Sequence, residues 1–421
     1  MMNTDLSICF YFPYFEDSGV PVLFYRMANE IAISNPNITI SIIDYEGGVM
    51  WRNILYLKNI TRIKFEDGVE VSPPHSSILV MQTFVPYYWP KELVISENQK
   101  LFFWNLHPHN LIPSLLPFPL LRKIPFNNTR AYKILSLFYY KRIQSLRNYT
   151  RCLIDNKGLA FMDKSNLDYT SEHLFLPIKN RDFIPVPASG SNLHLNNQNA
   201  VFLNKIVRIA WIGRLCDFKS YILVYSIKKL NEIAKEFNHI QFQFNIIGDG
   251  PFENYIKSET KNCIEISIHF HGSIPHSDID NFILANTDII MAMGTSALEG
   301  AKLAKPTIIL DPSLKEIKDD YIFRMLYDTK EFDLGHFVTS EDFLKNNRSL
   351  HNLLNEIIFN YNIHATKSFN YFEQYHNIKQ VKTIFLEKVL KSELIYSMID
   401  KSVFNKGFFL KLYNKIRGLK S

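Results

Sequence analysis

The sequence predicts an α/β protein built from two domains, each with a parallel sheet. Short apolar runs typical of buried strands alternate along the chain with segments of helical periodicity, and this alternation is the pattern of parallel α/β architecture. The chain has 421 residues, which is too long for one ordinary core because domains usually hold about 100 to 200 residues. Two doubly wound domains in tandem are therefore expected to face a central cleft.

The predicted strands form two series separated by a polar, Asn-rich linker. In the first half they are 6–12, 38–44, 76–84, 100–106 and 150–156. In the second half they are 206–213, 240–248, 264–272, 287–293 and 305–311. We therefore expect a first domain over 1–186, a linker over 187–205, a second domain over 206–375, and C-terminal helices with a basic tail over 376–421.

The composition excludes a disordered chain, since 47% of residues are hydrophobic and 14% aromatic. The four cysteines have no paired spacing, which argues against a zinc knuckle and favours a reducing compartment. The N-terminus lacks the features of a signal peptide, so we expect a cytoplasmic protein. The uncharged stretch 101–121 carries four prolines, which disfavours a membrane helix and favours a strand followed by an apolar loop.

The net charge of +6 is unevenly distributed. Residues 122–151 contain eight Lys and Arg, residues 401–421 contain six, and neither segment contains an acid. Residues 129–149 fit a helix whose packed face holds Ile134, Leu135, Phe138, Ile143 and Leu146. A solvated basic face is one interpretation of these segments. Adsorption to an anionic membrane is the other, and we favour it because the tail also carries aromatic residues. No base-reading module is present, so no nucleic-acid partner is expected.

Ligands of parallel α/β sheets bind beyond the carboxyl ends of the strands, and in the second half these ends carry suitable side chains. Arg214 and Lys219 follow the strand 206–213 and suit a diphosphate, although two surface cations are the alternative. Asp249 and Gly250 follow the next strand in a turn that by itself indicates only a tight connection.

The stretch "MAMGTSALEGAKLAKP", residues 291–306, reads as a strand, a tight turn and a short helix. Amides at Gly294, Thr295 and Ser296 would lie at the helix N-terminus, where phosphate is favoured. Glu299 has two interpretations. It completes a capping box with Ser296, or it accepts hydrogen bonds from a ribose diol.

Other polar pairs do not require a metal. Asp278 and Asp280 follow Pro275 and Ser277, which is typical of a helix start. His269 and His271 would share one face of a strand, but no third ligand lies nearby in the sequence, so zinc is not expected. We expect neither a metal nor another cofactor.

Three stretches, "IAWIGRLCDFK", "FNIIGDGP" and "FHGSIPHSDIDNFILANTDIIMAMGTSALEGAKLAKPTI", together resemble the donor domain of the glycosyl transferases group 1 family, nucleotide-sugar enzymes of GT-B fold. The resemblance spans about residues 205–312. It implies that Arg214 and Lys219 hold the donor diphosphate and that Glu299 binds the ribose hydroxyls. It also implies that Asp249 and Gly250 line the nucleotide pocket, and that the amides of 294–296 cap the distal phosphate.

The sequence departs from the family at one position. Met291 stands eight residues before Glu299, where the family usually has a glutamate that contacts the donor sugar. Inverting chemistry, which needs a positioned base, therefore becomes an option. Our first candidate for the base is His107, just beyond a strand end, and the second is His109. Packing in an apolar loop is the alternative for both.

The loop after the first strand is the other candidate part of the cleft. Ser18 and Gly19 stand where the family usually has paired glycines, and Glu16 and Asp17 precede them as further candidates for the base.

The sequence thus predicts a bacterial, metal-independent glycosyltransferase at the inner face of the cell membrane. It would move a sugar from a nucleoside diphosphate donor to a glycan or lipid-linked acceptor in surface-polysaccharide synthesis. A sugar-nucleotide epimerase of the same fold and a non-catalytic subunit that retained the donor pocket are the alternatives.

Overall fold

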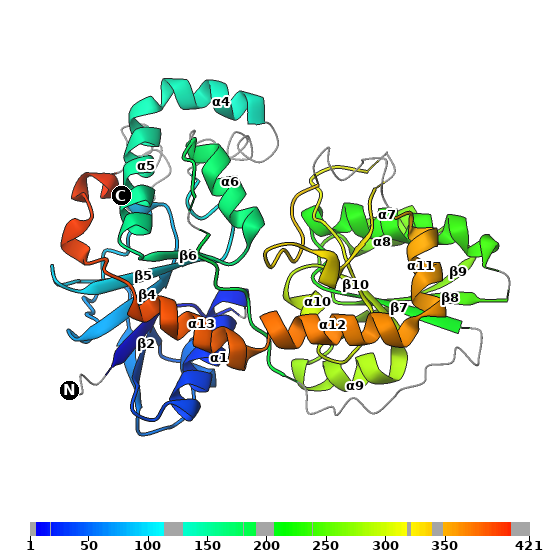
Figure 1. The fold of residues 1–421 in the computed structure, drawn as a ribbon, viewed down its shortest axis with the longest axis horizontal. Coiled ribbons are helices and arrows are strands. Elements are labelled where there is room, and N and C mark those ends of the chain that lie inside the picture. Colours follow the sequence, from blue (N-terminus) through cyan, green and yellow to red (C-terminus); the bar gives the residue numbers. More distant parts are fainter. Residues whose placement is uncertain are drawn as a thin grey trace. The chain divides into compact units, whose positions relative to one another are not determined.

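The computed structural model describes residues 6–16, 18–112, 129–179, 181–190, 206–237, 239–317, 321–338 and 348–405. The chain divides into two compact units. The first contains Met1–Val186 and Val381–Ser421, and the second contains Pro187–Gln380. Each unit has a six-stranded sheet with helices packed on it (Figure 1). The predicted fold class, α/β with two doubly wound sheets, is confirmed.

The sheet of the first unit has the strand order β3-β2-β1-β4-β5-β6, with parallel pairing throughout. Its strands are β1 (Ser7–Tyr11), β2 (Thr39–Tyr45), β3 (Ile60–Phe65), β4 (Ser77–Gln82), β5 (Lys100–Asn105) and β6 (Leu159–Phe161). Its helices are α1 (Gly19–Ser34), α2 (Val49–Asn53), α4 (Thr129–Phe138), α5 (Tyr140–Asp155), α6 (Lys164–Leu174) and α13 (Ile378–Leu390).

Aromatic contacts show which helices cover each face of this sheet. The ring of Phe10 on β1 lies 5.4 Å from that of Phe24 on α1 and 5.8 Å from that of Phe385 on α13. Phe103 on β5 points to the opposite face, where its ring lies 6.4 Å from that of Tyr149 on α5. Apolar side chains on both faces explain why these strands read as nearly continuous hydrophobic runs.

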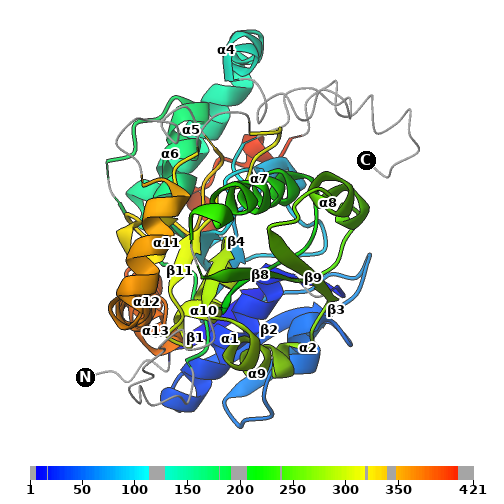
Figure 2. The same ribbon diagram turned by 90° about the vertical axis from the view of Figure 1, so that its right-hand side faces the viewer.

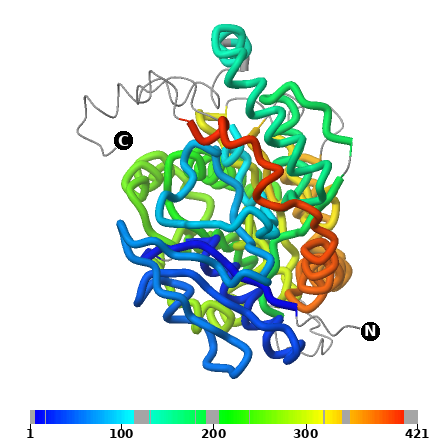
Figure 3. Tube along the Cα trace, turned by 90° about the vertical axis from the view of Figure 1, so that its left-hand side faces the viewer, coloured from blue at the N-terminus to red at the C-terminus, as the bar shows by residue number. Residues whose placement is uncertain are grey.

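The segment after α13 completes the first unit. The amide of Leu101 donates to the carbonyl of Leu394 at 2.9 Å, and Lys100 forms an antiparallel bridge with Ile395. Figure 3 shows this C-terminal segment, coloured red, against the first unit. It therefore satisfies backbone groups at the start of β5 that β4 and β6 leave unpaired.

The sheet of the second unit has the order β12-β11-β10-β7-β8-β9, and only the pair β11 and β12 is antiparallel within it. Its strands are β7 (Ile206–Ile212), β8 (Gln241–Ile247), β9 (Ile266–Gly272), β10 (Ile289–Ala292), β11 (Thr307–Ile309) and β12 (Arg324–Met325). Its helices are α7 (Asp217–Ile233), α8 (Glu253–Thr260), α9 (His276–Asn286), α10 (Thr295–Ala301), α11 (Leu350–Phe359) and α12 (Tyr361–Tyr375). Figure 2 shows α7 and α8 on one side of the sheet and α9 on the other. Strand order reverses between β10 and β7, as in doubly wound folds.

In the first unit one predicted strand was wrong and one observed strand was missed. Residues 150–155 belong to the end of α5, Asn156 is its C-cap residue, and the strand follows at Leu159–Phe161. The apolar run there is short, and Leu153 is buried as part of a helical stripe with Leu146 and Tyr149. β3 was not predicted at all, because most of its side chains are partly exposed and it carries Arg62 and Lys64.

The predicted helix over 129–149 is instead two helices, α4 and α5, which meet at Tyr139. Ile143 and Leu146 are buried as expected. Ile134 and Phe138 are not part of a packed face, since they are 59% and 81% exposed. The helical period was right, but the break at Tyr139 sets the orientation of α4 separately from that of α5.

No helix in the described ranges is long and apolar enough to cross a membrane. The predicted proline-rich loop falls largely on 113–128, which lies outside the described residues, as do most of the linker and of the basic tail.

Gly300 on α10 provides a test of the packing between this helix and β10. A Cβ at Gly300 would overlap the side chain of Ile290, so we expect Gly300→Ala to lower the free energy of unfolding by about 1–3 kcal/mol. Gly19→Ala is the matched control, because nothing lies within 4 Å of a Cβ there, and we expect a change within about 0.5 kcal/mol. Urea unfolding followed by tryptophan fluorescence measures both. Equal stabilities of the two variants would contradict the close packing of α10 on β10.

Candidate functional site

A pocket of about 340 Å³ lies at the carboxyl ends of β7, β8 and β9 in the second unit. Its walls come from the turn 212–214, the turn 247–249, the segment after β9 and two helices, with Ile279 from α9 and Glu299 from α10. The pocket thus gathers Arg214, Asp249 and Glu299, which lie far apart in the sequence. This is the edge of the sheet where ligands of doubly wound folds bind.

The turns after β7 and β8 touch through their backbones. The amide of Gly213 donates to the carbonyl of Ile247 at 2.9 Å, and the amide of Leu215 donates to that of Asp249 at 2.8 Å. A Cβ at Gly248 would overlap the carbonyl oxygen of Gly213, and one at Gly250 would overlap that of Leu215. Both glycines also have positive φ, 130° and 150°. Only glycine therefore allows these turns to approach so closely.

Two cations flank this pair of turns. Arg214 is exposed and lines the pocket. Lys219, in the first turn of α7, places its Nζ 3.6 Å from where a Cβ of Gly213 would lie. Burial lowers the pKa of Lys219. Among the described residues, neither cation has a carboxylate within 4.0 Å. Two unneutralised cations beside a glycine turn form a favourable site for an anion with several oxygens, such as a diphosphate.

Asp249 lies on the same pocket but is bonded to a neutral group. Ser273 donates from its hydroxyl to Oδ2 of Asp249 at 2.9 Å. A carboxylate in this position repels phosphate and accepts hydrogen bonds from hydroxyl or N–H groups. Asp249 therefore suits the uncharged part of a nucleotide rather than its phosphates. Gly250, the next residue, contributes close backbone packing against Leu215.

Glu299 is held by a buried lysine. Its Oε2 lies 2.5 Å from Nζ of Lys302, which is 5% exposed and also lies 2.8 Å from Oδ1 of Asp280. The Glu299 side chain is 13% exposed and lines the pocket. The ion pair orients a carboxylate that still reaches the pocket, as required of a group that accepts hydrogen bonds from a diol.

The capping box predicted for Ser296 is not formed. α10 begins at Thr295, its N-cap is Gly294 with φ 61°, and no side chain caps it. Asp280 likewise lies inside α9, whose N-cap is Pro275, so the helix start was correct but Ser277 is not its cap. Glu299 therefore has no capping role, and its neighbours in space are Lys302 and the pocket.

The predicted phosphate-capping amides are only partly available. The amide of Gly294 donates to the carbonyl of Leu334 at 2.6 Å, so it is already bonded. Thr295 is exposed and Ser296 is half-buried at the start of α10. None of these three residues lines the 340 Å³ pocket that Glu299 lines.

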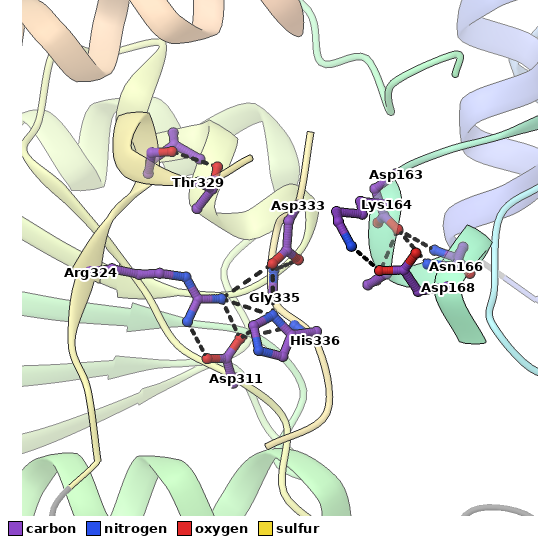
Figure 4. A network of polar contacts seen from close by, with 12 residues as sticks. Asp163, Lys164, Asn166, Asp168, Asp311, Arg324, Thr329, Asp333, Gly335 and His336 are labelled. Carbon is purple, nitrogen blue, oxygen red and sulfur yellow. Dashed lines mark hydrogen bonds and ion pairs between the residues drawn. The ribbon is translucent and has the colours of Figure 1, made fainter. Parts of the chain in front are cut away.

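A buried ionic cluster behind this turn was not predicted (Figure 4). Asp311 follows β11, is fully buried, and accepts two hydrogen bonds from Arg324, at 2.5 and 2.8 Å. The hydroxyl of Tyr321 and the amide of His336 also donate to Asp311. The cluster holds the segment 333–336, whose Leu334 carbonyl accepts the amide of Gly294.

Asp333 joins the cluster through His336, whose Nδ1 lies 2.7 Å from Oδ2 of Asp333. Burial alone raises the pKa of this carboxyl, but the hydrogen bond and charge of His336, together with the charge of Arg324, outweigh it and lower the pKa. Asp333 therefore stays ionised and keeps the segment bonded. The only part of this cluster that the sequence could indicate was Asp311, because it is a charged residue at the end of the predicted strand 305–311. Its partners lie 13 and 25 residues away, so spacing could not identify them.

The candidate histidines belong to the first unit. His107 and His109 follow β5, with ring centroids 4.8 Å apart. The amide of His109 donates to Nδ1 of His107 at 3.2 Å. Desolvation lowers the pKa of His107. The pKa of His109 is lowered to about 3 by burial and by the nearby His107 and His173. Both rings are therefore neutral near pH 7.

The hydrogen bond that Nδ1 of His107 accepts from the amide of His109 opposes the predicted role of His107 as a base. A neutral imidazole has one N–H and one acceptor nitrogen, so acceptance at Nδ1 places the proton on Nε2. In this tautomer Nε2 donates a hydrogen bond and cannot accept a proton. His107 as a base would need to lose the bond from His109, and its catalytic role stays a prediction.

Ser18 and Gly19 lie at the start of α1. Ser18 is the extended N-cap residue without a side-chain cap bond, and Gly19 is the first helical residue. A Cβ at Gly19 would meet nothing within 4 Å, so packing within the chain does not demand a glycine there. Asp17 lies outside the described residues.

In the described part of the chain, no group of three or more His, Cys, Asp or Glu side chains is arranged so that it could hold a metal ion. His269 and His271 both lie on β9, with ring centroids 6.4 Å apart. Nε2 of His271 lies 2.9 Å from Oδ1 of Asn245, so this ring nitrogen has a protein partner.

Comparisons with known proteins bear on the fold. No family model and no curated protein matches the chain. The structure of a trehalose-6-phosphate synthase, OtsA, is 11% identical with a TM-score of 0.53 and covers 91% of this chain and 99% of its own. A structure described as trehalose-6-phosphate from E. coli bound with UDP-2-fluoro glucose is 10% identical with a TM-score of 0.52, covering 91% and 98%. WaaG, a glycosyltransferase involved in lipopolysaccharide biosynthesis, is 11% identical with a TM-score of 0.49, covering 90% and 99%. The likeness to the two structures above 0.5 shows that the chain has the two-domain GT-B fold.

The ionic cluster can be tested through stability. Arg324→Met would leave the fully buried Asp311 without its charge partner, and we expect the free energy of unfolding to fall by about 3–5 kcal/mol. Arg348→Met is the control, because Arg348 is 45% exposed and pairs with Asp328 and Glu356 at the surface. Its loss should cost at most about 1 kcal/mol. Urea unfolding measures both variants, and a cost at Arg324 no larger than that at Arg348 would contradict the structural role of the cluster.

Proposed function

We propose that this protein is a glycosyltransferase that moves a sugar from a nucleoside diphosphate donor to an acceptor hydroxyl. The observation that carries the proposal is the pocket of the second unit, which Arg214, Asp249 and Glu299 line together, with Nζ of Lys219 close to the neighbouring Gly213. The two cations, which have no carboxylate within 4.0 Å among the described residues, favour the diphosphate, and the carboxylates favour hydroxyl groups. A nucleoside diphosphate carries both kinds of group on one molecule.

Each residue has a defined part in this proposal. Arg214 and Lys219 hold the diphosphate and neutralise the charge that develops on it as the sugar leaves, a role that other enzymes give to a metal ion. Glu299, oriented by Lys302, accepts hydrogen bonds from the ribose hydroxyls. Asp249 accepts hydrogen bonds from the ribose or the base. The proposal therefore includes metal-independent transfer.

The resemblance found in the sequence agrees with the pocket. The three stretches that resemble the donor domain of group 1 enzymes contribute Arg214, Asp249 and Glu299, and all three residues line one pocket. The GT-B fold is compatible with this assignment, and one solved structure of this fold was determined with UDP-2-fluoro glucose bound. Which nucleotide and which sugar this chain takes is left to measurement.

For the acceptor we propose a glycan or a lipid-linked glycan in bacterial surface-polysaccharide synthesis. The first unit has an aromatic pocket of about 260 Å³ at the carboxyl ends of its strands, with walls that include Tyr11, Tyr45, Phe65 and Phe84. Thr83 also lines it, is 2% exposed, and has no partner for its hydroxyl within the described ranges. Aromatic faces with a few polar groups suit an uncharged sugar ring.

A non-catalytic subunit that binds the donor is the second candidate. Met291, which stands where group 1 enzymes usually have a glutamate, is fully buried in β10 and cannot contact a sugar. A donor-binding subunit would bind the nucleotide sugar without cleaving it. Loss of sugar from the donor in the presence of acceptor extracts therefore distinguishes the two candidates.

The first test is a thermal-shift screen of the purified protein against UDP, GDP, CDP, ADP and dTDP and their common sugar conjugates. A ligand that binds only the folded protein adds about 2.7 kcal/mol to the free energy of unfolding when its concentration is one hundred times its Kd, and this raises the melting temperature. We expect a shift with one nucleotide and a smaller or no shift for the same nucleotide with Glu299→Ala. If none of these ligands changes the melting temperature, the proposed donor site is contradicted.

Lys219 can be tested by its charge. We expect Lys219→Met to weaken nucleoside diphosphate binding by about 1.5–3 kcal/mol, because it removes a charge-assisted hydrogen bond. Since burial lowers the pKa of Lys219, its positive charge is lost at a lower pH than that of an ordinary lysine. Affinity of the unmodified protein should therefore fall as the pH rises through this lowered pKa.

Lys219→Arg is the matched variant, because guanidinium keeps its charge in this range and should retain binding at alkaline pH. Titration calorimetry at several pH values compares the three proteins. If the affinity of Lys219→Arg for the nucleotide falls with rising pH in the same way as that of the unmodified protein, the ammonium of Lys219 does not contact the diphosphate.

A further inference from the structure

Helix α4 presents an apolar face to solvent. Ile134, Leu137 and Phe138 are 59%, 73% and 81% exposed, and their i, i+3, i+4 spacing places them side by side on one face. The other face is packed, since Tyr132 is 1% and Ser136 5% exposed. α4 lies across the end of α5 and projects from the body of the first unit (Figures 1 and 2). Three large apolar side chains together on a projecting helix form a surface that fits a partner.

The surroundings of this face are positively charged. Residues 129–151 contain six Lys and Arg and no Asp or Glu. Two of the six are used within the protein, because Arg142 lies over the ring of Tyr87 and Arg147 donates to the carbonyl of Leu174. Arg130, Lys133 and Lys141 are exposed. Lys133 has a long contact of 3.9 Å with Glu172, which is itself 55% exposed.

We propose that α4 docks this protein onto an anionic phospholipid membrane. Ile134, Leu137 and Phe138 enter the boundary between headgroups and acyl chains, while Arg130, Lys133 and Lys141 contact lipid phosphates. Tyr140, which is 57% exposed, lies at the level of the headgroups. Amphipathic helices with aromatic and aliphatic residues on one face and cations beside them bind membranes in this way.

The charge pattern selects the membrane over other occupants. A symmetric dimer through α4 would bring the same cations of two copies together, and like charges across an interface oppose association. Nucleic acid would satisfy the cations but leave Ile134, Leu137 and Phe138 without an apolar partner. An anionic phospholipid membrane is anionic at its surface and apolar just beneath, so it satisfies both sets. This inference concerns the first unit and does not depend on the donor pocket of the second.

The test is flotation of the full chain with vesicles of phosphatidylcholine containing phosphatidylglycerol, and with vesicles of phosphatidylcholine alone. We expect the unmodified protein to float with the anionic vesicles only. The triple variant Ile134→Ser, Leu137→Ser, Phe138→Ser should bind them about a hundredfold more weakly, because it loses the inserted side chains. The double variant Arg130→Gln, Lys141→Gln should bind about tenfold more weakly.

Matched controls remove equal numbers of exposed groups elsewhere. Ile264→Ser, Phe359→Ser, Ile363→Ser replaces side chains that are 81%, 83% and 54% exposed in the second unit. Lys58→Gln, Lys100→Gln lowers the net charge by the same amount as the cation variant at exposed positions. Both controls should float like the unmodified protein. All substitutions are at exposed positions, and the melting temperature confirms that each variant is folded.

Several results would overturn the proposal. The triple variant could float as well as the unmodified protein, the protein could bind the neutral vesicles equally, or the apolar control could lose as much binding as the α4 variant. A dimer that the triple variant dissociates, without flotation of the unmodified protein, would assign the face to a second copy instead.

Insertion itself is measured with Phe138→Trp. Its emission should shift to shorter wavelength on addition of anionic vesicles and be quenched by brominated lipid acyl chains, whereas Phe359→Trp should show neither effect. An unchanged emission of Phe138→Trp in the presence of bound vesicles would exclude α4 as the inserted element.

Discussion

The close backbone contact between the turns after β7 and β8 is the constraint on which the candidate donor site depends. Gly248 and Gly250 have no side chain to separate these turns from Gly213 and Leu215, and two backbone hydrogen bonds join them. The contact places Arg214 at the rim of the pocket and brings the start of α7, with Lys219, beside Gly213. A larger residue at either glycine would push the two turns apart and separate the cations from Asp249.

The part of the pocket wall that Glu299 forms is held by charge rather than by close backbone packing. Lys302 is nearly fully buried between Glu299 and Asp280 and so joins α10 to α9. Behind α10, the cluster of Asp311 and Arg324 holds the segment whose Leu334 carbonyl bonds Gly294. Buried ion pairs stabilise little in total, because their desolvation is costly, but an unpaired member is strongly unfavourable. Such pairs therefore define one arrangement of the turn and helix that carry Glu299.

Sequence patterns predicted the second unit better than the first. All five predicted strands from 206 to 311 are present, because each is a compact apolar run followed by a glycine, an aspartate or a turn. In the first unit, β3 was missed because Arg62 and Lys64 interrupt its pattern, and the apolar end of α5 was mistaken for a strand. Periodicity also could not show that Tyr139 ends α4, which leaves Ile134 and Phe138 in solvent.

The same contrast holds for the site. The resemblance to group 1 donor domains implied that Arg214, Asp249 and Glu299 bind one donor, and the three residues line one pocket at the carboxyl ends of the strands. The partners of Asp311 were not predictable, since Arg324 lies 13 residues away on a two-residue strand. Lys302 lies three residues after Glu299, a spacing at which helical side chains pair, but nothing in the sequence linked Lys302 to Asp280. Long-range ion pairs leave no periodic signal in a sequence. The spacing of Ser296 and Glu299 suggested a local capping box, but α10 begins at Thr295, so Ser296 is not the N-cap residue. The carboxylate of Glu299 forms an ion pair with Lys302 instead.

The central claim is that a nucleoside diphosphate binds at the carboxyl edge of the second sheet. Hydrogen exchange of the full chain, measured by mass spectrometry with UDP, GDP, CDP, ADP and dTDP in turn, tests it most directly. For the nucleotide that binds, amides of 213–219, 247–250 and 295–299 should exchange more slowly, because the ligand contacts all three segments together. Protection confined to other parts of the chain, with these segments unchanged at saturation, would contradict the account.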